Sequence, residues 1–263
     1  MRYQEGTIKL SPTEDGDILR QVLRSRFITH EQLWKITAAG GARTPRSTFN
    51  WRLQRLVQHQ LLKREQIALF GCTIVYSIGR LGMEHLATQG EYCAGVVSDV
   101  DPEAHGDDGA VLHALRVNDI HLALKASGTL TKWRWETQIR SQNELMSHTY
   151  AKDYDAIVSV LIDGHEIEFA LEYERVAKAC RKYSIIRRRI ESECLVGRFV
   201  YLVSNYHLLN YLTQQFWRTK REIYFGLVED FCEQLFDTKV LNSTWTRNVP
   251  LRVALLGGQS VGG

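Results

Sequence analysis

The sequence lacks several patterns that would place it in a specialised class of protein. It has five cysteines, and no two of them have the Cys-x-x-Cys spacing. An odd, scattered set of cysteines argues against a disulfide framework and a zinc knuckle, so we expect a protein of the reducing cytoplasm. The chain begins MRYQEGTIKLSPTEDGD without an apolar run, and no segment approaches the roughly 20 apolar residues of a spanning helix. We therefore expect neither secretion nor membrane insertion.

Acidic residues are missing from two tracts of the chain. The formal net charge of the 263 residues is only +3, so the class of partner has to be judged from where the charges lie. No Asp or Glu occurs between Gln32 and Arg64, or between Lys178 and Arg189. The basic residues of these tracts are Lys35, Arg43, Arg46, Arg52, Arg55, Lys63 and Arg64 in the first, and Lys178, Arg181, Lys182, Arg187, Arg188 and Arg189 in the second. Both tracts are candidate phosphate-facing surfaces.

Three helical patterns precede residue 60. Apolar residues recur at helical spacing in the first, at Ile18, Val22 and Leu23. The second, THEQLWKITAAGG, has Thr29 followed three residues later by Gln32, which is the spacing of a capping box, and it ends at a Gly-Gly pair. The third begins after Pro45, and its apolar stripe consists of Phe49, Leu53, Leu56 and Val57. A tight cluster of short helices is therefore predicted.

Two strand-like runs, Leu62–Leu69 and Thr73–Ile78, follow these helices and precede a short helical segment, GRLGMEHLATQG. Three helices and then a β-ribbon is the order of a winged helix-turn-helix, in which the third helix enters the major groove and the ribbon contacts the DNA backbone. We interpret residues 1–90 as such a domain, bound to double-stranded DNA; the alternative is a small helical domain that binds protein. The candidate DNA-binding residues are Arg43, Arg46, Asn50, Arg52, Arg55, Lys63 and Arg64.

The composition becomes acidic and rich in turn residues at 91–108, which we interpret as a linker. Residues 109–263 are expected to form a mixed α/β domain with a central sheet. The expected elements are a helix to about 127, strands at about 130–138, 153–162 and 165–174, a basic helix from 175 to about 193, a strand at 197–204, a helix at 206–217, a strand at 221–228, a helix at 229–236 and a final run PLRVALL. Phe216, Trp217 and Tyr224 are candidates for a homodimer surface, although we expect them in the core.

The dipeptide Asp163-Gly164 predicts a two-residue type I′ hairpin between the second and third of these strands. If Ile162 pairs with His165, the register places Asp155 opposite Glu172, and Asp153 opposite Glu174. Four carboxylates would then share one patch. Like charges that oppose each other destabilise a ladder by roughly 0.2–1 kcal/mol, so something should offset the repulsion.

A divalent cation is one such compensation. Carboxylate oxygens suit Mg²⁺ or Mn²⁺, which also take phosphate as a ligand. Period-two alternation puts Glu166, Glu168, Glu172 and Glu174 on one face of their strand. The basic helix that follows would supply positive charge beside a phosphate. The alternative is a solvated acidic face, salt-bridged to neighbouring Lys and Arg.

The expected elements run as a helix, three strands, a helix and a strand, with an acid on the second strand and an acidic pair on the third. This order resembles the PD-(D/E)XK (restriction-endonuclease-like) nuclease core. The resemblance implies that Asp155 in KDYDAIV and Glu172 in ALEYE hold a catalytic Mg²⁺ or Mn²⁺. Glu174 stands where that core has its lysine, and Lys178 on the next helix is the candidate replacement. This departure leaves open a degenerate site.

More narrowly, WRWETQ and YDAIVSVLIDGHEIEFALEYERVAKACRKY, together with the winged helix upstream, resemble the replication-relaxation family of mobile elements and the MobC-type plasmid relaxases. The resemblance implies a catalytic set of Asp155, Glu172, Glu174 and Lys178, with Tyr183 following on the helix. It also implies an origin in a mobile genetic element, with other transfer or replication proteins as further candidate partners.

Three functions remain open at this point. The first is a metal-dependent DNA nickase; since the sequence has no His-x-His pair of the kind found in tyrosine relaxases, it would have to use the carboxylates. Tyr173 and Tyr183 as covalent nucleophiles are less favoured than the same residues as packing. The second is a non-catalytic DNA-binding regulator of transcription, replication or transfer with a degenerate nuclease-like domain. The third is a protein-binding adaptor.

Overall fold

The computed structural model describes residues 8–38, 45–67, 73–90, 108–217, 219–242 and 248–257. The chain divides into two compact units, Met1–Asn118 and Asp119–Gly263. The division falls within one helix, α6 (Asp108–Ala126). Each unit has a β-sheet of its own.

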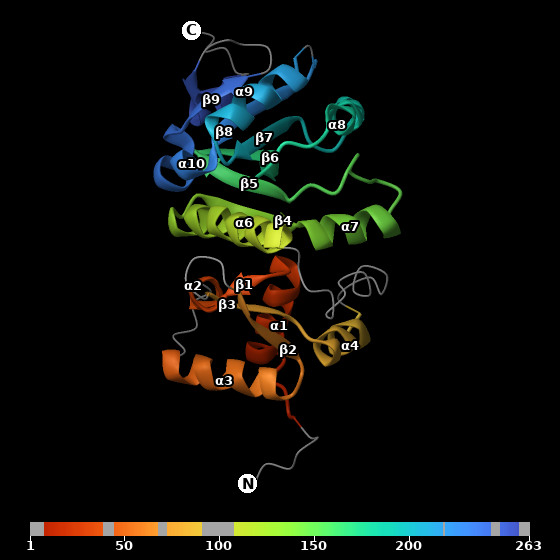
Figure 1. Ribbon diagram of the computed structural model, residues 1–263, viewed down its shortest axis with the longest axis vertical. Coiled ribbons are helices and arrows are strands. Elements are labelled where there is room, and N and C mark those ends of the chain that lie inside the picture. Colours follow the sequence, from red (N-terminus) through yellow and green to blue (C-terminus); the bar gives the residue numbers. More distant parts are fainter. Residues whose placement is uncertain are drawn as a thin grey trace. The chain divides into compact units, whose positions relative to one another are not determined.

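Unit 1 contains the predicted order of helices and strands (Figure 1). Its helices are α1 (Glu14–Ser25), α2 (His30–Ala38), α3 (Arg46–Gln58) and α4 (Arg80–Thr88), with β2 (Leu62–Ile67) and β3 (Thr73–Ile78) between the last two. A two-residue strand, β1 (Ile28–Thr29), joins them in an antiparallel sheet of order β1-β3-β2. The second half of the ribbon therefore pairs with residues from before α2 as well as with its own partner strand.

Local sequence signals explain where the helices of unit 1 begin and which faces they bury. The Thr29 hydroxyl accepts the Gln32 backbone N–H at 3.1 Å, and the Gln32 side chain accepts the Thr29 N–H at 3.2 Å, so the predicted capping box starts α2. In α3, Phe49, Leu53 and Leu56 are buried, as their helical spacing predicts.

Unit 2 is a mixed α/β fold around a seven-stranded sheet of order β10-β9-β8-β7-β6-β5-β4. Its strands are β4 (Leu130–Trp135), β5 (Ala156–Ile162), β6 (His165–Glu174), β7 (Arg198–Val203), β8 (Glu222–Leu227), β9 (Lys239–Asn242) and β10 (Val249–Pro250). The pairs β6–β7 and β7–β8 are parallel, and the other neighbours are antiparallel. The central strands are thus the ones buried most completely.

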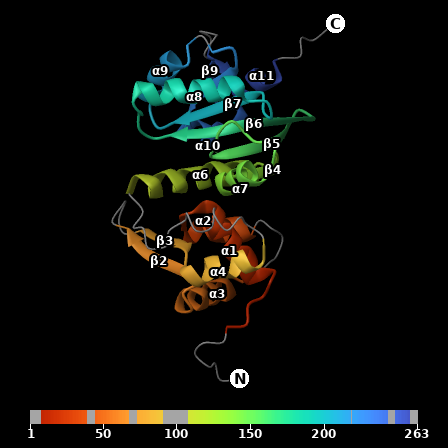
Figure 2. The same cartoon turned by 90° about the vertical axis from the view of Figure 1, so that its right-hand side faces the viewer.

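The helices of unit 2 are α7 (Glu136–Leu145), α8 (Cys180–Ser192), α9 (Tyr206–Gln215), α10 (Val228–Gln234) and α11 (Leu251–Leu256), with a 3₁₀ turn at Leu235–Asp237. Helices α8 and α9 lie together on one face of the sheet (Figure 2). Their buried side chains form one apolar cluster with β5, β6, β7 and β8, which includes Tyr183, Tyr201, Phe216 and Phe225.

The predicted hairpin register is confirmed. Ile162 pairs with His165, and the ladder continues to Ala156 opposite Leu171. Asp163 and Gly164 both have positive φ, 48° and 81°, as a type I′ turn requires. This register places Asp155 and Glu172, two residues of the candidate site, next to the end of the β5–β6 ladder that lies away from the turn.

Three predicted boundaries are wrong, and one strand was not predicted. The strand from 130 ends at Trp135, because the Gln138 side chain accepts the Trp135 N–H at 3.1 Å and starts α7. The next strand begins at Ala156 rather than 153, since the Asp155 carboxylate takes up the Tyr173 N–H in place of a backbone carbonyl. The basic helix begins at Cys180 rather than 175. The final run is the end of β10 followed by α11, and β9 was not predicted.

Phe216 and Tyr224 are buried as expected, whereas Trp217 is exposed, so the prediction of Trp217 in the core is wrong. Of the segment interpreted as a linker, 91–108, only Asp108 belongs to the described residues, where it begins α6. Arg43 lies outside them. Within the described part of the chain, no helix is both long enough and apolar enough to cross a membrane.

Candidate functional site

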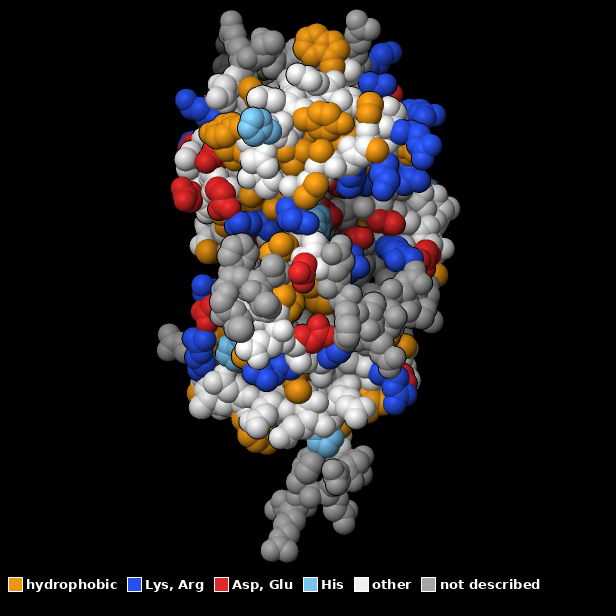
Figure 3. Space-filling model, viewed as in Figure 1, with side chains coloured by type: hydrophobic (Ala, Val, Ile, Leu, Met, Phe, Trp, Pro, Cys, Tyr) orange, Lys and Arg blue, Asp and Glu red, His pale blue; other side chains and the backbone are white. Residues whose placement is uncertain are grey.

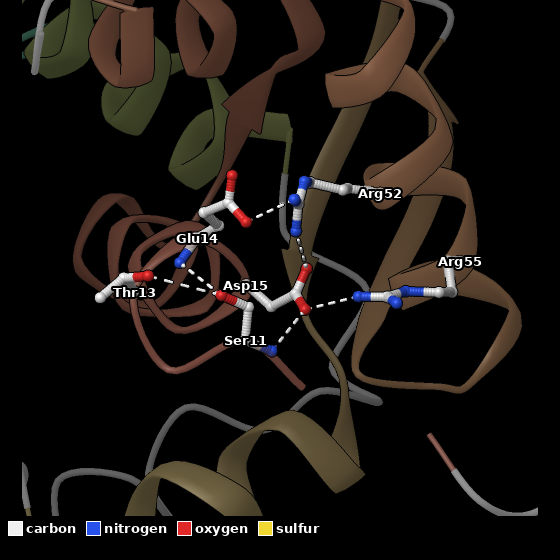
Figure 4. A network of polar contacts seen from close by, with 6 residues as sticks. All are labelled: Ser11, Thr13, Glu14, Asp15, Arg52 and Arg55. Carbon is white, nitrogen blue, oxygen red and sulfur yellow. Dashed lines mark hydrogen bonds and ion pairs between the residues drawn. The ribbon is translucent and has the colours of Figure 1, made fainter. Parts of the chain in front are cut away.

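Two arginines of α3 are bound to a buried carboxylate from α1. Asp15 is completely buried, and it accepts hydrogen bonds from Arg55 at 2.5 Å, from Arg52 at 3.4 Å and from the backbone N–H of Ser11 at 2.8 Å (Figure 4). Arg52 also pairs with Glu14. The two arginine side chains are only 16% and 17% exposed. These two candidate DNA-binding residues therefore fasten α3 to α1.

The other candidate DNA-binding residues that the structure describes, Arg46, Asn50, Lys63 and Arg64, lie beside partners that are less deeply buried than Asp15. Arg46 pairs with Glu31 at 2.5 Å, and this guanidinium holds the pKa of Glu31 below its usual value. Asn50 contacts the His30 ring at 3.0 Å, and Lys63 pairs with Glu65 at 2.6 Å. Arg64 lies opposite Tyr76 in the β2–β3 ladder. Exposed pairs of this kind contribute about 0–1 kcal/mol each, so they can be exchanged for phosphate at little cost.

The outer face of α3 carries amide side chains and an exposed tryptophan. Ser47, Asn50, Trp51, Gln54 and Gln58 are exposed on it. Trp51 is 57% exposed and lies against the Arg55 guanidinium, 4.8 Å from ring centroid to Cζ. A shallow groove of about 370 Å³ is lined by Trp51, Gln54, Arg55 and Gln58. The buried Asp15–Arg55 contact therefore also positions an exposed surface.

In unit 2, Asp155 and Glu172 lie beside each other at the entrance to β5. Asp155 directly precedes β5, and its Oδ2 accepts the N–H of Tyr173, the residue after Glu172, at 2.7 Å. Burial is the main cause that raises the pKa of Glu172, and the negative charge of the nearby Asp155 acts in the same direction. The predicted register thus brings together the two residues proposed as metal ligands.

Glu172 is a carboxylate that is poorly compensated where it lies. It is 4% exposed, and burial, reinforced by Asp155, raises its pKa to about 7, while Lys152 and Lys178 act in the opposite direction. Its ion-pair partner is Lys152, whose side chain is 12% exposed. Lys152 could not be predicted from the sequence, because extending the β5–β6 register does not place it near Glu172; the chain departs from the ladder before β5.

Glu174 is 3% exposed and pairs with Lys178, the candidate catalytic lysine, at 2.5 Å. Burial would lower the pKa of Lys178, but the carboxylates of Glu174 and Glu172 raise it above its usual value. The connection from Arg175 to Ala179 holds Lys178 beside the end of β6. Glu172 and Glu174 are therefore salt-bridged, as the alternative interpretation expected, but they are buried instead of solvated.

The predicted patch of four carboxylates is wrong in its extent. Asp153 is exposed outside β5 and accepts a hydrogen bond from Asn143 of α7 at 2.8 Å, instead of lying opposite Glu174 in a ladder. Earlier on β6, Glu168 accepts from Ser159 at 3.2 Å. Among the described residues, no group of three or more His, Cys, Asp or Glu side chains is arranged to hold a metal ion.

Tyr183 and Tyr201 lie near these carboxylates, whereas Tyr173, between Glu172 and Glu174 in β6, has its side chain on the other face of the strand. Tyr183 is buried, its hydroxyl accepts the Lys178 N–H at 3.0 Å, and burial raises its pKa; Tyr173 is 5% exposed. Both belong to the packing of the unit, which disfavours a nucleophilic role. Tyr201 lies directly across the parallel ladder from Glu172, is fully buried, and its hydroxyl has no hydrogen-bond partner in the described structure. The pKa of Tyr201 is raised well above the usual value, by burial and by Glu172.

The sequence from α1 to the end of α8, residues 19–193, matches the family model described as replication-relaxation. The match covers more than half of the 263 residues. The chain belongs to the replication-relaxation family. A search of curated proteins finds no match. The matched region of this replication-relaxation protein contains the α3 surface and the carboxylates of β6, and it ends before β7, so the strand that carries Tyr201 lies outside it.

Proposed function

We propose that this replication-relaxation protein binds DNA in the replication or transfer of a mobile genetic element. In this proposal unit 1 is a winged helix-turn-helix, and unit 2 is a restriction-endonuclease-like domain. The family membership supports the general role. The observation that carries the proposal for unit 2 is the placement of Asp155 beside the buried Glu172, with Lys152 paired to it.

For unit 1, the proposal assigns two different tasks to the residues of α3. Arg52 and Arg55 hold the helix in place through Asp15. Asn50, Gln54 and Gln58 are exposed, and an amide side chain can form a bidentate contact with adenine in the major groove. Arg46, Lys63 and Arg64, and Arg43 from outside the described residues, would contact phosphates, which position the protein without reading the sequence.

Replacing Gln54 and Gln58 together by Ala is expected to relax sequence preference on duplex DNA. Each bidentate base contact contributes about 1–3 kcal/mol of discrimination, so preference for the best site should fall about 5-fold to 160-fold for each glutamine that reads a base. The measurement is selection from a random duplex library, followed by fluorescence anisotropy on the best and a scrambled site. The matched control is Gln214→Ala with Gln234→Ala, since both are exposed glutamines of unit 2. Equal preference in the variant and in the wild type would contradict the role of α3.

For unit 2, the carboxylates of Asp155 and Glu172 fit a cation that takes most of its ligands from water and substrate phosphate. Mg²⁺ is commonly bound by one or two carboxylates together with water and substrate phosphate, so Asp155 and Glu172 suffice without a third acidic residue. Mn²⁺ takes the same oxygen ligands. A bound cation would polarise a phosphate oxygen and lower the pKa of a bound water. Lys152 and Lys178, next to the acids, supply the positive charge that faces the phosphate.

The proposal predicts saturable binding of Mg²⁺ and Mn²⁺ to the purified protein. At a cation concentration 100 times the dissociation constant, the folded state gains about 2.7 kcal/mol, which a thermal shift detects. Asp155→Asn and Glu172→Gln should each remove the shift. Calorimetry gives the stoichiometry, and nicking of supercoiled DNA, abolished in the same variants, tests the chemistry.

A second candidate is a non-catalytic regulator with a degenerate nuclease-like domain. Glu174 at the position of the nuclease lysine favours it, because Lys178 is already engaged with that carboxylate. This candidate predicts duplex binding with no cation-dependent shift and no nicking, in a protein whose fold is intact. The cation titration therefore separates the two.

A further inference from the structure

The outer face of α8 carries a group of basic side chains that have no acidic partner among the described residues. Five basic residues lie on this helix: Arg181, Lys182, Arg187, Arg188 and Arg189. No ion pair between described residues includes any of the five, although Arg188 donates a hydrogen bond to the Ser184 carbonyl one turn earlier, at 3.4 Å. Basic side chains are also visible together in Figure 3, where Figure 1 places α8.

Helices α3 and α8 differ in how far acidic residues neutralise their basic side chains. In α3 the arginines at 46, 52 and 55 all pair with carboxylates, so the positive charge of that tract is largely neutralised within the protein. In α8 the first acid is Glu191, near the end of the helix. The positive field at the surface is thus expected to be stronger over α8 than over α3.

Helical geometry gathers the charges of α8 on one face. Tyr183 and Ile190, two turns apart, are buried and point to the core of unit 2. Arg181 with Arg188, and Lys182 with Arg189, repeat at the same two-turn spacing on the opposite side, and each pair is about 10 Å apart along the axis. All four of these residues are exposed, with Ile185 between them. The apolar stripe of α8 is already used in packing.

We infer that this face, called the α8 basic face and formed by Arg181, Lys182, Arg188 and Arg189, binds the phosphates of duplex DNA as a second contact surface besides α3. Guanidinium and ammonium groups match phosphate oxygens, and such contacts do not depend on base sequence. Single-stranded DNA is disfavoured because its binders stack bases on aromatic side chains, and the one aromatic residue of α8, Tyr183, is buried. An anionic membrane is disfavoured because the apolar stripe is not available for insertion.

The position of α8 suits this role. The five residues 175–179 connect it directly to β6, whose last residues include Glu172 and Glu174. Lys178 in this connection bonds both to Glu174, through Nζ, and to the Tyr183 hydroxyl of α8, through its backbone N–H. Phosphates held along α8 would therefore lie on an element anchored to the carboxylates of the proposed site.

The inference rests on DNA binding by the chain, and the test uses the full-length protein. The quadruple variant Arg181→Ala, Lys182→Ala, Arg188→Ala and Arg189→Ala is compared with Lys9→Ala, Lys132→Ala, Lys220→Ala and Lys239→Ala, which removes the same charge from exposed positions elsewhere. Affinity for a random-sequence duplex is measured from 50 to 200 mM salt. Log affinity falls with log salt, and each phosphate that is no longer neutralised makes this slope less steep by about 0.9, so the slope of the α8 variant should be less steep by about 3.6.

The two proposals fail in different ways. A wild-type protein that shows no salt-dependent DNA binding would refute the proposed function. A wild-type protein that binds duplex DNA, with the same slope in the α8 variant and in the control, would refute the α8 basic face alone. If circular dichroism shows that the quadruple variant does not fold, two double variants take its place: Arg181→Gln with Lys182→Gln, and Arg188→Gln with Arg189→Gln. Each is expected to make the slope of log affinity against log salt less steep by about 1.8.

Two further ligands check the identity of the partner. A single-stranded oligonucleotide of equal length, or vesicles containing anionic phospholipid, are titrated in parallel. Loss of either interaction in the α8 variant, with duplex binding unchanged, would overturn the assignment to duplex DNA.

Discussion

Replacing Asp15 by Ala is expected to lower the free energy of unfolding of unit 1 by about 3 kcal/mol, the lower end of the range for a buried ion pair that loses one partner. The change removes the acceptor for Arg52, Arg55 and the Ser11 N–H at once. The lower end is appropriate because the arginine side chains are 16–17% exposed and can turn partly to water. The measurement is amide hydrogen exchange in α1 and α3, which reports on unit 1 separately from unit 2.

A matched control exists on the same helix. Asp17 also pairs with an arginine, Arg20, at 2.5 Å, but its carboxylate is 67% exposed. Asp17→Ala should change stability by less than about 1 kcal/mol, as is usual for surface pairs. If Asp15→Ala were as mild as Asp17→Ala, the Asp15 network would not hold α3 in place.

The Asp15 network also shows where sequence reasoning ends in unit 1. The capping box of Thr29 and the apolar stripe of α3 were predictable, because each depends on residues three or four positions apart. Counting charges between Gln32 and Arg64 indicated an uncompensated basic surface. The acids that neutralise Arg52 and Arg55 come from 37 to 40 residues earlier, in α1, and only the tertiary fold brings them there.

The same limit applies in unit 2. A two-residue turn fixes the pairing of both strands, so the Asp163-Gly164 dipeptide was enough to place Asp155 near Glu172. Beyond the ladder no periodicity constrains the chain. Asp153 consequently turns to Asn143, and Lys152 reaches Glu172 from a position that no register predicts. The addition of β9 and β10 at the far edge of the sheet was missed because both are short.

The burial of Glu172 has a consequence for the pH dependence of stability. Its pKa is raised to about 7 in the folded protein, above the usual value of 4.5. The folded state therefore binds this proton more tightly than the unfolded state, and the contribution of Glu172 to stability falls as the pH rises from 4.5 to 7. The fall amounts to about 3 kcal/mol.

Replacing Lys152 by Met should enlarge this effect. Without the ammonium group, Glu172 remains buried with less compensation, and its charged form costs about 3–5 kcal/mol at neutral pH. The pKa of Glu172 should rise further, since Lys152 is one of the groups that lower it. The variant is thus expected to be strongly destabilised at pH 7.5 and to regain most of the loss near pH 5, where Glu172 is protonated. Urea unfolding of the cation-free protein at both pH values measures this.

The double variant Lys152→Met with Glu172→Gln separates charge from packing. Removing both partners of a buried pair is often close to neutral, so the double variant should recover most of the stability at pH 7.5 and lose the pH dependence. If it stays as unstable as Lys152→Met alone, the lysine acts through a contact other than Glu172, such as that of its ammonium group with the Tyr154 ring, with Nζ 5.2 Å from the ring centroid. Recovery would establish that Lys152 stabilises the fold by neutralising the buried Glu172 carboxylate.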